Sequence, residues 1–254
     1  MPSKIDDDCY PILRGRNISK YYFEAPTEWI WYKPELITQK IGGRPRILEN
    51  FLHTKIYIQD IAKSINACYC DKPFLANDTL NLIYEVKSPY HFKTILALLN
   101  SKLINDWFNS EYQEGLHIKV NQLQTIPIPI MSETEQQPFI VLADKMLTLN
   151  SDLQTKRQRF LKRLSDNLCI IKITGILEHF DELEFKQFVA ELKKQKITLS
   201  LKQQDEWEEY FNEYKAECCN IVNQINTTDR EIDGMVYELY GLTKEEVKII
   251  EGDN

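Results

Sequence analysis

The stretch WEEYFNEYKAECCNIVNQINTTDREIDGMVYEL, residues 207–239, decides the fold because its apolar residues repeat without a slip. They alternate steps of four and three residues, which is the spacing of a heptad seam along one helix face. The series is Trp207, Phe211, Tyr214, Cys218, Ile221, Ile225, Thr228, Ile232, Met235 and Leu239. At 1.5 Å per residue, the segment predicts a helix about 50 Å long. Such a helix needs a partner for its apolar stripe, either the 137–166 segment or another chain.

Helix signals continue on both sides of this seam. Apolar spacing predicts one helix over about 137–166 and another over about 176–196, and Gly241 is expected to end the long helix. Three Ser or Thr residues are followed three positions later by Gln or Glu, the spacing of a capping box. They are Thr134 with Gln137, Ser200 with Gln203, and Thr243 with Glu246.

The amino-terminal half has shorter and more mixed signals. Brief β-favouring runs bounded by Pro, Asn, Asp or Gly predict strands at 29–32, 55–58, 67–70 and 80–86. Apolar residues at steps of three and four from Phe92 to Trp107 then predict one amphipathic helix. Pro127 and Pro129 each fix their own φ and bias the preceding residue away from the α conformation, so this segment is expected to be extended.

These patterns together predict an α+β protein. A mixed α/β globule at the amino terminus is followed by long carboxy-terminal helices, packed as an antiparallel coiled coil or a helical bundle. We expect the two domains to span residues 1–135 and 136–254.

Charge is unevenly distributed along the 254 residues. The net charge is −7, but the balance is +1 in residues 1–130 and −8 in residues 131–254. The whole-chain charge therefore does not exclude a polyanionic partner for the first half. No apolar run approaches the roughly 20 residues of a membrane span, and the first residues lack the apolar core of a secretory signal. We expect a cytoplasmic protein without a membrane partner.

Motifs for catalysis or metal binding do not occur in the sequence. The six cysteines form no Cys-x-x-Cys pair, and the four histidines have no zinc-site spacing, so no metal is expected. Cys68 and Cys70 are expected to be small buried side chains on one strand face. The chain has no nucleophile-elbow, zincin or P-loop motif. No catalytic residue is therefore assigned, and a hydrolytic enzyme is the weakest hypothesis.

Basic residues beside glycines and aromatic residues are the more informative feature. Arg14 and Arg16 flank Gly15, and Gly42 and Gly43 lie in a loop with three cations. Lys and Arg in such loops suit phosphates, while Arg, Gln and Asn can read base edges in the major groove. The candidate DNA contacts are Arg14, Arg16, Lys20, Lys40, Arg44, Arg46, Lys55 and Lys63, with Gln39 as a base reader and Lys119 with Asn121 as a further pair. The alternative is that these residues are ordinary solvated surface charges.

Several motifs, taken in order, resemble one known family. They are PILRGRNI at 11–18 followed by Tyr21, NDTL at 77–80, ILALLNSKL at 95–103, IKVNQL at 118–123, IPIP at 126–129, DREID at 229–233 and VYELYGLT at 236–243. The chain resembles the TaqI-like C-terminal specificity domain over residues 10–165 and again over 226–251. That domain is the target recognition module of Type IIG restriction-modification enzymes and related adenine-specific DNA methyltransferases. Asn17 departs from the family pattern, in which an aspartate is commoner.

The resemblance implies sequence-specific recognition of double-stranded DNA. It also implies the architecture of Type I specificity subunits, in which an α/β globule reads the major groove and long helices act as spacer and docking surface. Methyltransferase and nuclease modules would be supplied in cis or by a separate subunit. S-adenosylmethionine and Mg are expected in those modules and no cofactor in this chain. The rival hypothesis is a helical protein–protein scaffold that does not contact DNA.

Overall fold

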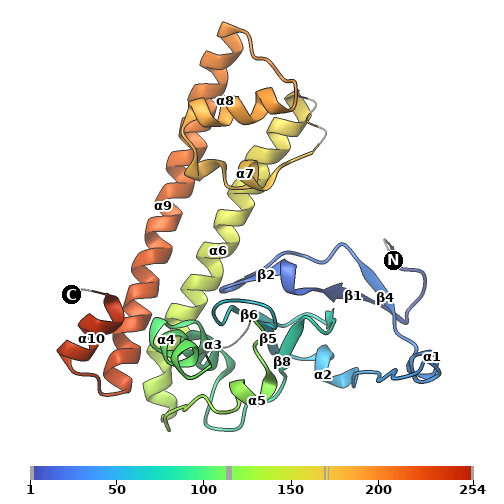
Figure 1. The fold of residues 1–254 in the computed structure, drawn as a ribbon, viewed down its shortest axis with the longest axis vertical. Helices are drawn as coiled ribbons and strands as arrows, with labels where there is room; N and C mark the ends of the chain where they lie inside the picture. Colours follow the sequence, from blue (N-terminus) through green and yellow to red (C-terminus); the bar gives the residue numbers. More distant parts are fainter. Residues whose placement is uncertain (1–2, 113–115, 169, 171, 253–254) are drawn as a thin grey trace. The chain divides into compact units, whose positions relative to one another are not determined.

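The computed structural model describes residues 3–112, 116–168, 170 and 172–252. Contacts divide the chain into two compact units. Unit 1 comprises Met1–Leu147 and Asp229–Asn254, and unit 2 comprises Thr148–Thr228. The two longest helices, α6 (Glu133–Leu168) and α9 (Leu201–Leu239), each contribute residues to both units (Figure 1).

The described residues of unit 1 form three small sheets. The first has the order β4-β1-β7, in which β1 pairs antiparallel with β4 and parallel with β7. The second is the antiparallel β2-β3 hairpin. The third has the order β6-β5-β8, and all of its pairs are antiparallel. The strands are β1 (Cys9–Leu13), β2 (Ile18–Ser19), β3 (Tyr22–Phe23), β4 (Trp29–Trp31), β5 (Lys55–Gln59), β6 (Ala67–Cys70), β7 (Leu75–Ala76) and β8 (Leu80–Ile83). Predicted strands at 29–32, 55–58 and 67–70 are confirmed within one residue, whereas the 80–86 strand ends at Ile83.

The core of this α/β region lies between the sheets. Leu13, Tyr57, Cys68, Cys70 and Leu80 are among its fully or nearly fully buried side chains. The expectation that both cysteines are buried is confirmed, and burial raises the pKa of the Cys68 thiol. These cysteines therefore pack as small apolar groups.

Unit 1 also contains short helices. They are α1 (Pro34–Thr38), α2 (Glu49–Leu52), α3 (Phe92–Asn100), α4 (Lys102–Glu111), α5 (Val120–Leu123) and α10 (Lys244–Glu251), together with the 3-10 turn η1 (Gly15–Asn17). The prediction of a single helix from Phe92 to Trp107 is wrong, because the chain turns at Ser101. Ser101 has an extended ψ of 154°, and its hydroxyl accepts a hydrogen bond from the Ile104 amide, so it begins a second helix.

All of the regular secondary structure in the described residues of unit 2 is helical. The unit contains the later part of α6, the earlier part of α9, and between them α7 (Gly175–Glu178), η2 (Phe180–Glu182) and α8 (Phe185–Lys194). The helix predicted over 176–196 is therefore broken into three elements. The α6 and α9 segments pack antiparallel, since Phe160 contacts Phe211 and Lys156 pairs with Glu217. The partner of the heptad seam is thus a helix of the same chain.

The capping predictions have mixed outcomes. Ser200 with Gln203 and Thr243 with Glu246 form the predicted boxes. The box before α6 lies two residues earlier than predicted, at Ser132 and Glu135, and the helix begins at Glu133. The mixed α/β region followed by long packed helices confirms the predicted fold class. None of the described helices combines the length and the apolar composition that a membrane span requires.

Candidate DNA interface

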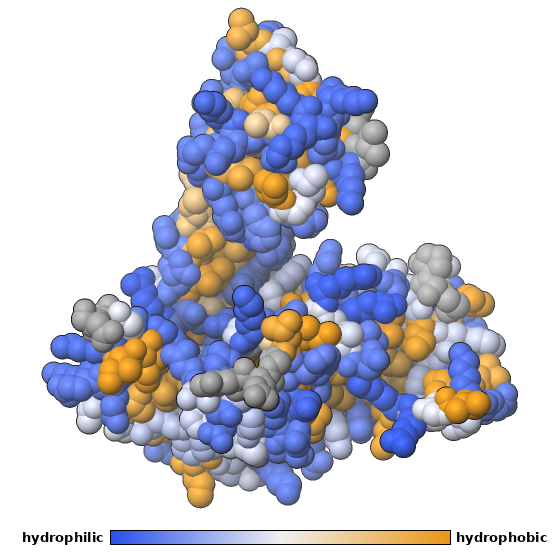
Figure 2. Space-filling view, in the orientation of Figure 1, coloured by the Kyte–Doolittle hydropathy of each residue, from blue (hydrophilic) through white to orange (hydrophobic). Residues whose placement is uncertain are grey.

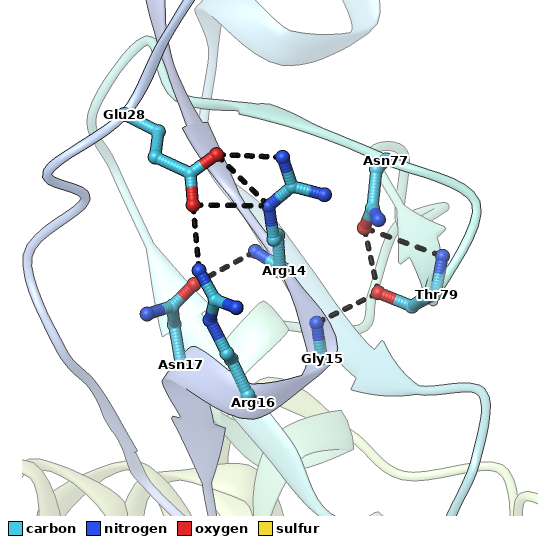
Figure 3. Close-up of polar contacts among 7 residues, drawn as sticks. All are labelled: Arg14, Gly15, Arg16, Asn17, Glu28, Asn77 and Thr79. Atoms are coloured by element: carbon cyan, nitrogen blue, oxygen red, sulfur yellow. Dashed lines mark hydrogen bonds and ion pairs between the residues drawn. The ribbon is translucent and has the colours of Figure 1, made fainter. Parts of the chain in front are cut away.

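The turn after β1 holds two of the candidate arginines (Figure 3). The Arg14 amide donates to Asn17 Oδ1 at 3.0 Å, and the Gly15 amide donates to Thr79 Oγ1 at 2.8 Å. The Thr79 hydroxyl in turn donates to Asn77 Oδ1 at 2.6 Å. A Cβ on Gly15 would lie 3.1 Å from the Thr79 carbonyl oxygen, so a larger residue is crowded here. The motif residues therefore fix the backbone from which both arginines project.

Glu28 holds the two arginine side chains together. Its carboxylate accepts from Arg14 Nη2 and from Arg16 Nη2, each at 2.6 Å. The hydrogen bond from Arg14 lowers the pKa of Glu28, and the carboxylate raises the pKa of Arg14. With two guanidinium groups and one carboxylate, the cluster keeps a net charge of +1. Glu28 lies outside the quoted motif, so the motif does not predict this partner.

A second group of candidates lies on the loop between α1 and α2. Gln39, Lys40, Arg44 and Arg46 are all exposed there. The tight turn needs its glycines: Gly42 has φ of +76°, and a Cβ on Gly43 would lie 1.8 Å from the Ile37 carbonyl oxygen. Arg46 also lies over the Phe51 ring, 6.0 Å from its centroid. The loop thus presents three cations and one amide to solvent on a defined turn.

Two further loops bring Lys63 close to Lys119 and Asn121 in the fold. The Ala62 amide donates to the Leu116 carbonyl at 2.9 Å, and the Ile118 amide donates to the Asp60 carbonyl at 2.6 Å. His117 Nδ1 lies 2.8 Å from Asp60 Oδ2, a contact that sequence reasoning did not identify. Lys63, Lys119 and Asn121 are exposed. Among the described loops, this is the third place where candidate side chains gather.

Lys55 differs from the other candidates because it is buried. Its ammonium group donates to the carbonyl oxygens of His53 and Lys72 at 2.7 and 2.6 Å. Its side chain has no exposed surface, and burial lowers its pKa. The position corrects the expectation of a DNA contact: Lys55 ties β5 to the segment that follows β6.

Lys20 lies in the β2-β3 hairpin, and its charge acts on two carboxylates of α9, the buried Asp233 and the half-buried Asp229. Burial raises the pKa values of Asp229 and Asp233, and the positive charge of Lys20 opposes both shifts. All three residues belong to unit 1. The positive charge of Lys20 therefore partly offsets the negative charge of these two carboxylates.

The LLNSK motif, residues 98–102, has a structural role: its asparagine side chain bonds the backbone of a neighbouring strand. Asn100 Oδ1 accepts from the Ala67 amide at 2.9 Å, and Asn100 Nδ2 donates to the Ala67 carbonyl at 3.0 Å. This side chain thus bonds the end of β6 in the way a neighbouring strand would. Asn105 Oδ1 similarly accepts from the Ile65 amide at 2.6 Å. These buried amides join α3 and α4 to the sheet that carries the Lys63 loop.

The described residues contain no group of three or more His, Cys, Asp or Glu side chains suited to a metal ion. Cationic and amide side chains from separate loops are what the candidate interface offers. Such groups bind phosphates and base edges, whereas acid–base or nucleophilic chemistry would need other residues.

Two family models match successive parts of the chain. Residues 10–128 match the TaqI-like C-terminal specificity domain, and residues 132–236 match a domain of unknown function, DUF8810. The first match contains all of the candidate residues. No curated protein matches the chain.

Proposed function

Since residues 10–128 are a TaqI-like C-terminal specificity domain, whose role is DNA target recognition in restriction-modification, we propose that this chain reads double-stranded DNA directly. The observation that carries the proposal is the presence of exposed cations on three loops of this matched domain. Phosphate contacts by Lys and Arg position such a protein, and amide or guanidinium groups read bases.

The proposed contacts are the candidates whose side chains are exposed or partly exposed. Arg44, Arg46 and Lys40 bind phosphates, and Gln39 beside them reads a base edge. Arg14 and Arg16 form a second contact from the Glu28 cluster. Lys63 forms a third contact together with Lys119 and Asn121, and Lys20 adds a weaker one. Lys55 is omitted because its ammonium group is buried.

The chemistry that follows recognition is proposed for other modules. A methyltransferase module would transfer a methyl group from S-adenosylmethionine to adenine, and a nuclease module would use Mg to cleave DNA. Those modules are joined in cis or bind as separate subunits of a Type IIG-like enzyme. Within this chain, residues 1–135 would read DNA, and residues 136–254 would act as spacer and docking surface.

A salt-titrated binding assay tests the DNA contact. We expect replacement of Arg44 and Arg46 by alanine to weaken binding to duplex DNA and to reduce the slope of log K against log salt by about 2. Each lost phosphate contact releases about 0.9 fewer counterions. The control replaces Lys72 and Lys87, two exposed lysines outside the proposed contacts, and removes the same charge.

An unchanged slope in R44A/R46A would refute the assignment of this loop. If the full chain binds duplex DNA no better than the control proteins of the assay do at low salt, the proposed function is refuted and the rival hypothesis of a protein–protein scaffold is favoured. If the chain does bind duplex DNA, selection from randomised duplexes tests its specificity, because a recognition module enriches one sequence.

A further inference from the structure

Three cations on α6 in unit 2 lie on one face of the helix. Arg159, Lys162 and Arg163 are spaced at three and four residues, so their side chains are neighbours. All three are exposed, and they line a surface cavity of about 380 Å³ together with Asp166 and Tyr214. Tyr214 comes from α9, so the cavity lies where the two helices pack within unit 2.

Five other cations of unit 2 have carboxylate partners. These pairs are Lys156 with Glu217, Arg157 with Asp181, Lys194 with Glu191, Lys202 with Glu206, and Lys215 with Glu184. Across the described part of this unit, no carboxylate lies within ion-pair distance of Arg159, Lys162 or Arg163. Like charges at these spacings destabilise a helix. Of the five residues that line the first cavity, three are cations and one, Asp166, is an acid, so a net charge of +2 is available to an external anion.

A second cavity adjoins the first. It has a volume of about 390 Å³, and Arg163 lines both cavities. Its wall also includes Leu168, Trp207 and Tyr210, together with the polar side chains of Gln203 and Asn167 and the carboxylate of Glu206. Hydrophilic side chains cover most of the face of unit 2 seen in Figure 2. Since Glu206 offsets Arg163 in the second cavity, the net positive charge lies in the first cavity.

We propose that Arg159, Lys162 and Arg163 form a second DNA contact that binds the phosphate backbone without reading sequence. The inference rests on the proposed function of unit 1, because it takes duplex DNA as the ligand. It assigns a binding role to the part of the chain that matches the domain of unknown function. Specificity stays with the loops of unit 1, and the α6 cations add affinity that falls as salt rises.

The test compares two triple variants of the full chain in the same salt titration. Replacing Arg159, Lys162 and Arg163 by alanine should reduce the salt slope by about 2 to 3 and weaken binding about tenfold or more at low salt. It should leave the sequence enriched from randomised duplexes unchanged. The matched control replaces Lys172, Lys186 and Lys193, three exposed lysines of unit 2 away from the cavity.

Equal effects of the two triple variants would overturn the inference, because the loss would then reflect overall charge. A change in the enriched sequence would also overturn it. If the α6 triple variant has no specific effect while R44A/R46A still reduces the salt slope, the further inference is refuted and the proposed function is not. Absence of duplex binding by the unaltered chain would instead refute both. Circular dichroism of each variant checks that unit 2 keeps its helices.

Discussion

At the residue scale, Asp233 shows how one buried carboxylate connects distant segments of unit 1. Its Oδ1 accepts a hydrogen bond from the Lys102 amide at 2.7 Å, so it caps α4 from a position 131 residues away in the chain. Burial raises the pKa of Asp233 to about 6, the charge of Asp229 raises it further, and the bond from Lys102 with the charge of Lys20 opposes the shift.

This shift predicts a pH-dependent difference between the protein and its D233N variant. With a folded pKa above the unfolded value, the contribution of Asp233 to stability is fully present below about pH 4 and is lost as pH rises through about 6. As pH rises from 4 to 7, we expect the free energy of unfolding of the variant to increase by roughly 1–2 kcal/mol relative to that of the unaltered protein, allowing for partial solvent screening. Urea unfolding at several pH values measures it.

The control for this measurement is E238Q, which changes an exposed carboxylate of the same helix. The pH trend of D233N is compared directly with that of this variant. A D233N difference that is constant with pH, or that falls as pH rises, would contradict the assigned sign.

Residue-scale predictions from sequence did not include the partners of the predicted side chains. Arg14 and Arg16 lie just before and within the 3-10 turn η1. Their shared carboxylate, Glu28, lies 12 and 14 residues away and is positioned by the pairing of β4 with β1. Likewise, the burial of Lys55 depends on two carbonyl groups that only the folded chain brings together.

At the scale of elements, a buried ion pair joins α6 to η2 in unit 2. Arg157 Nε and Nη2 donate to the two oxygens of Asp181 at 2.8 and 2.7 Å, and both side chains are less than a tenth exposed. Cys219 Sγ also contacts the Asp181 carbonyl from α9. The pair therefore holds the short connecting elements against the helical hairpin.

Removing one partner of this pair should destabilise unit 2 strongly. D181A leaves the Arg157 guanidinium buried without its carboxylate, and we expect a loss of about 3–5 kcal/mol in the free energy of unfolding. K156A, which removes a half-exposed pair with Glu217, should cost at most about 1 kcal/mol. Thermal unfolding followed by helix circular dichroism compares them; similar losses in both variants would contradict the distinction.

Long periodic elements were predictable from sequence, and breaks between short ones were not. The seam of α9 continues for 33 residues from Trp207 to Leu239, so any other structure would expose it. The turn at Ser101 is different, because apolar spacing continues across it. What decides the break is the burial of Asn100 and Asn105 against backbone groups of the sheet, a tertiary effect that local spacing does not contain.

At the scale of the whole molecule, the two compact units do not follow one another in the chain. Unit 2 is an insertion between two parts of unit 1, which residues 229–254 complete. Besides the Asp233 cap, Tyr237 donates to Glu251, Lys102 pairs with Glu251 at 3.0 Å, and Tyr240 donates to the Pro127 carbonyl at 2.5 Å. The carboxy-terminal segment is thus bonded to both α4 and the IPIP segment.

Deleting residues 229–254 should therefore loosen unit 1 although every candidate DNA contact remains. Loss of the bond to a charged acceptor should speed hydrogen exchange at the first turn of α4 by about tenfold or more. Exchange measured by mass spectrometry on peptides from residues 92–111 tests this. A shorter deletion of 244–254, which keeps Asp233, is the matched control; equal exchange in both variants would contradict the capping role.

The insertion of unit 2 has a consequence for synthesis on the ribosome. The loops that carry the candidate DNA contacts are translated first, yet the α9 segment that caps α4 emerges only after all of unit 2 has been made. A nascent chain stalled at residue 228 would hold those loops on an unfinished scaffold. The capacity to bind a target is therefore expected to appear late in translation, when the final helical segments dock.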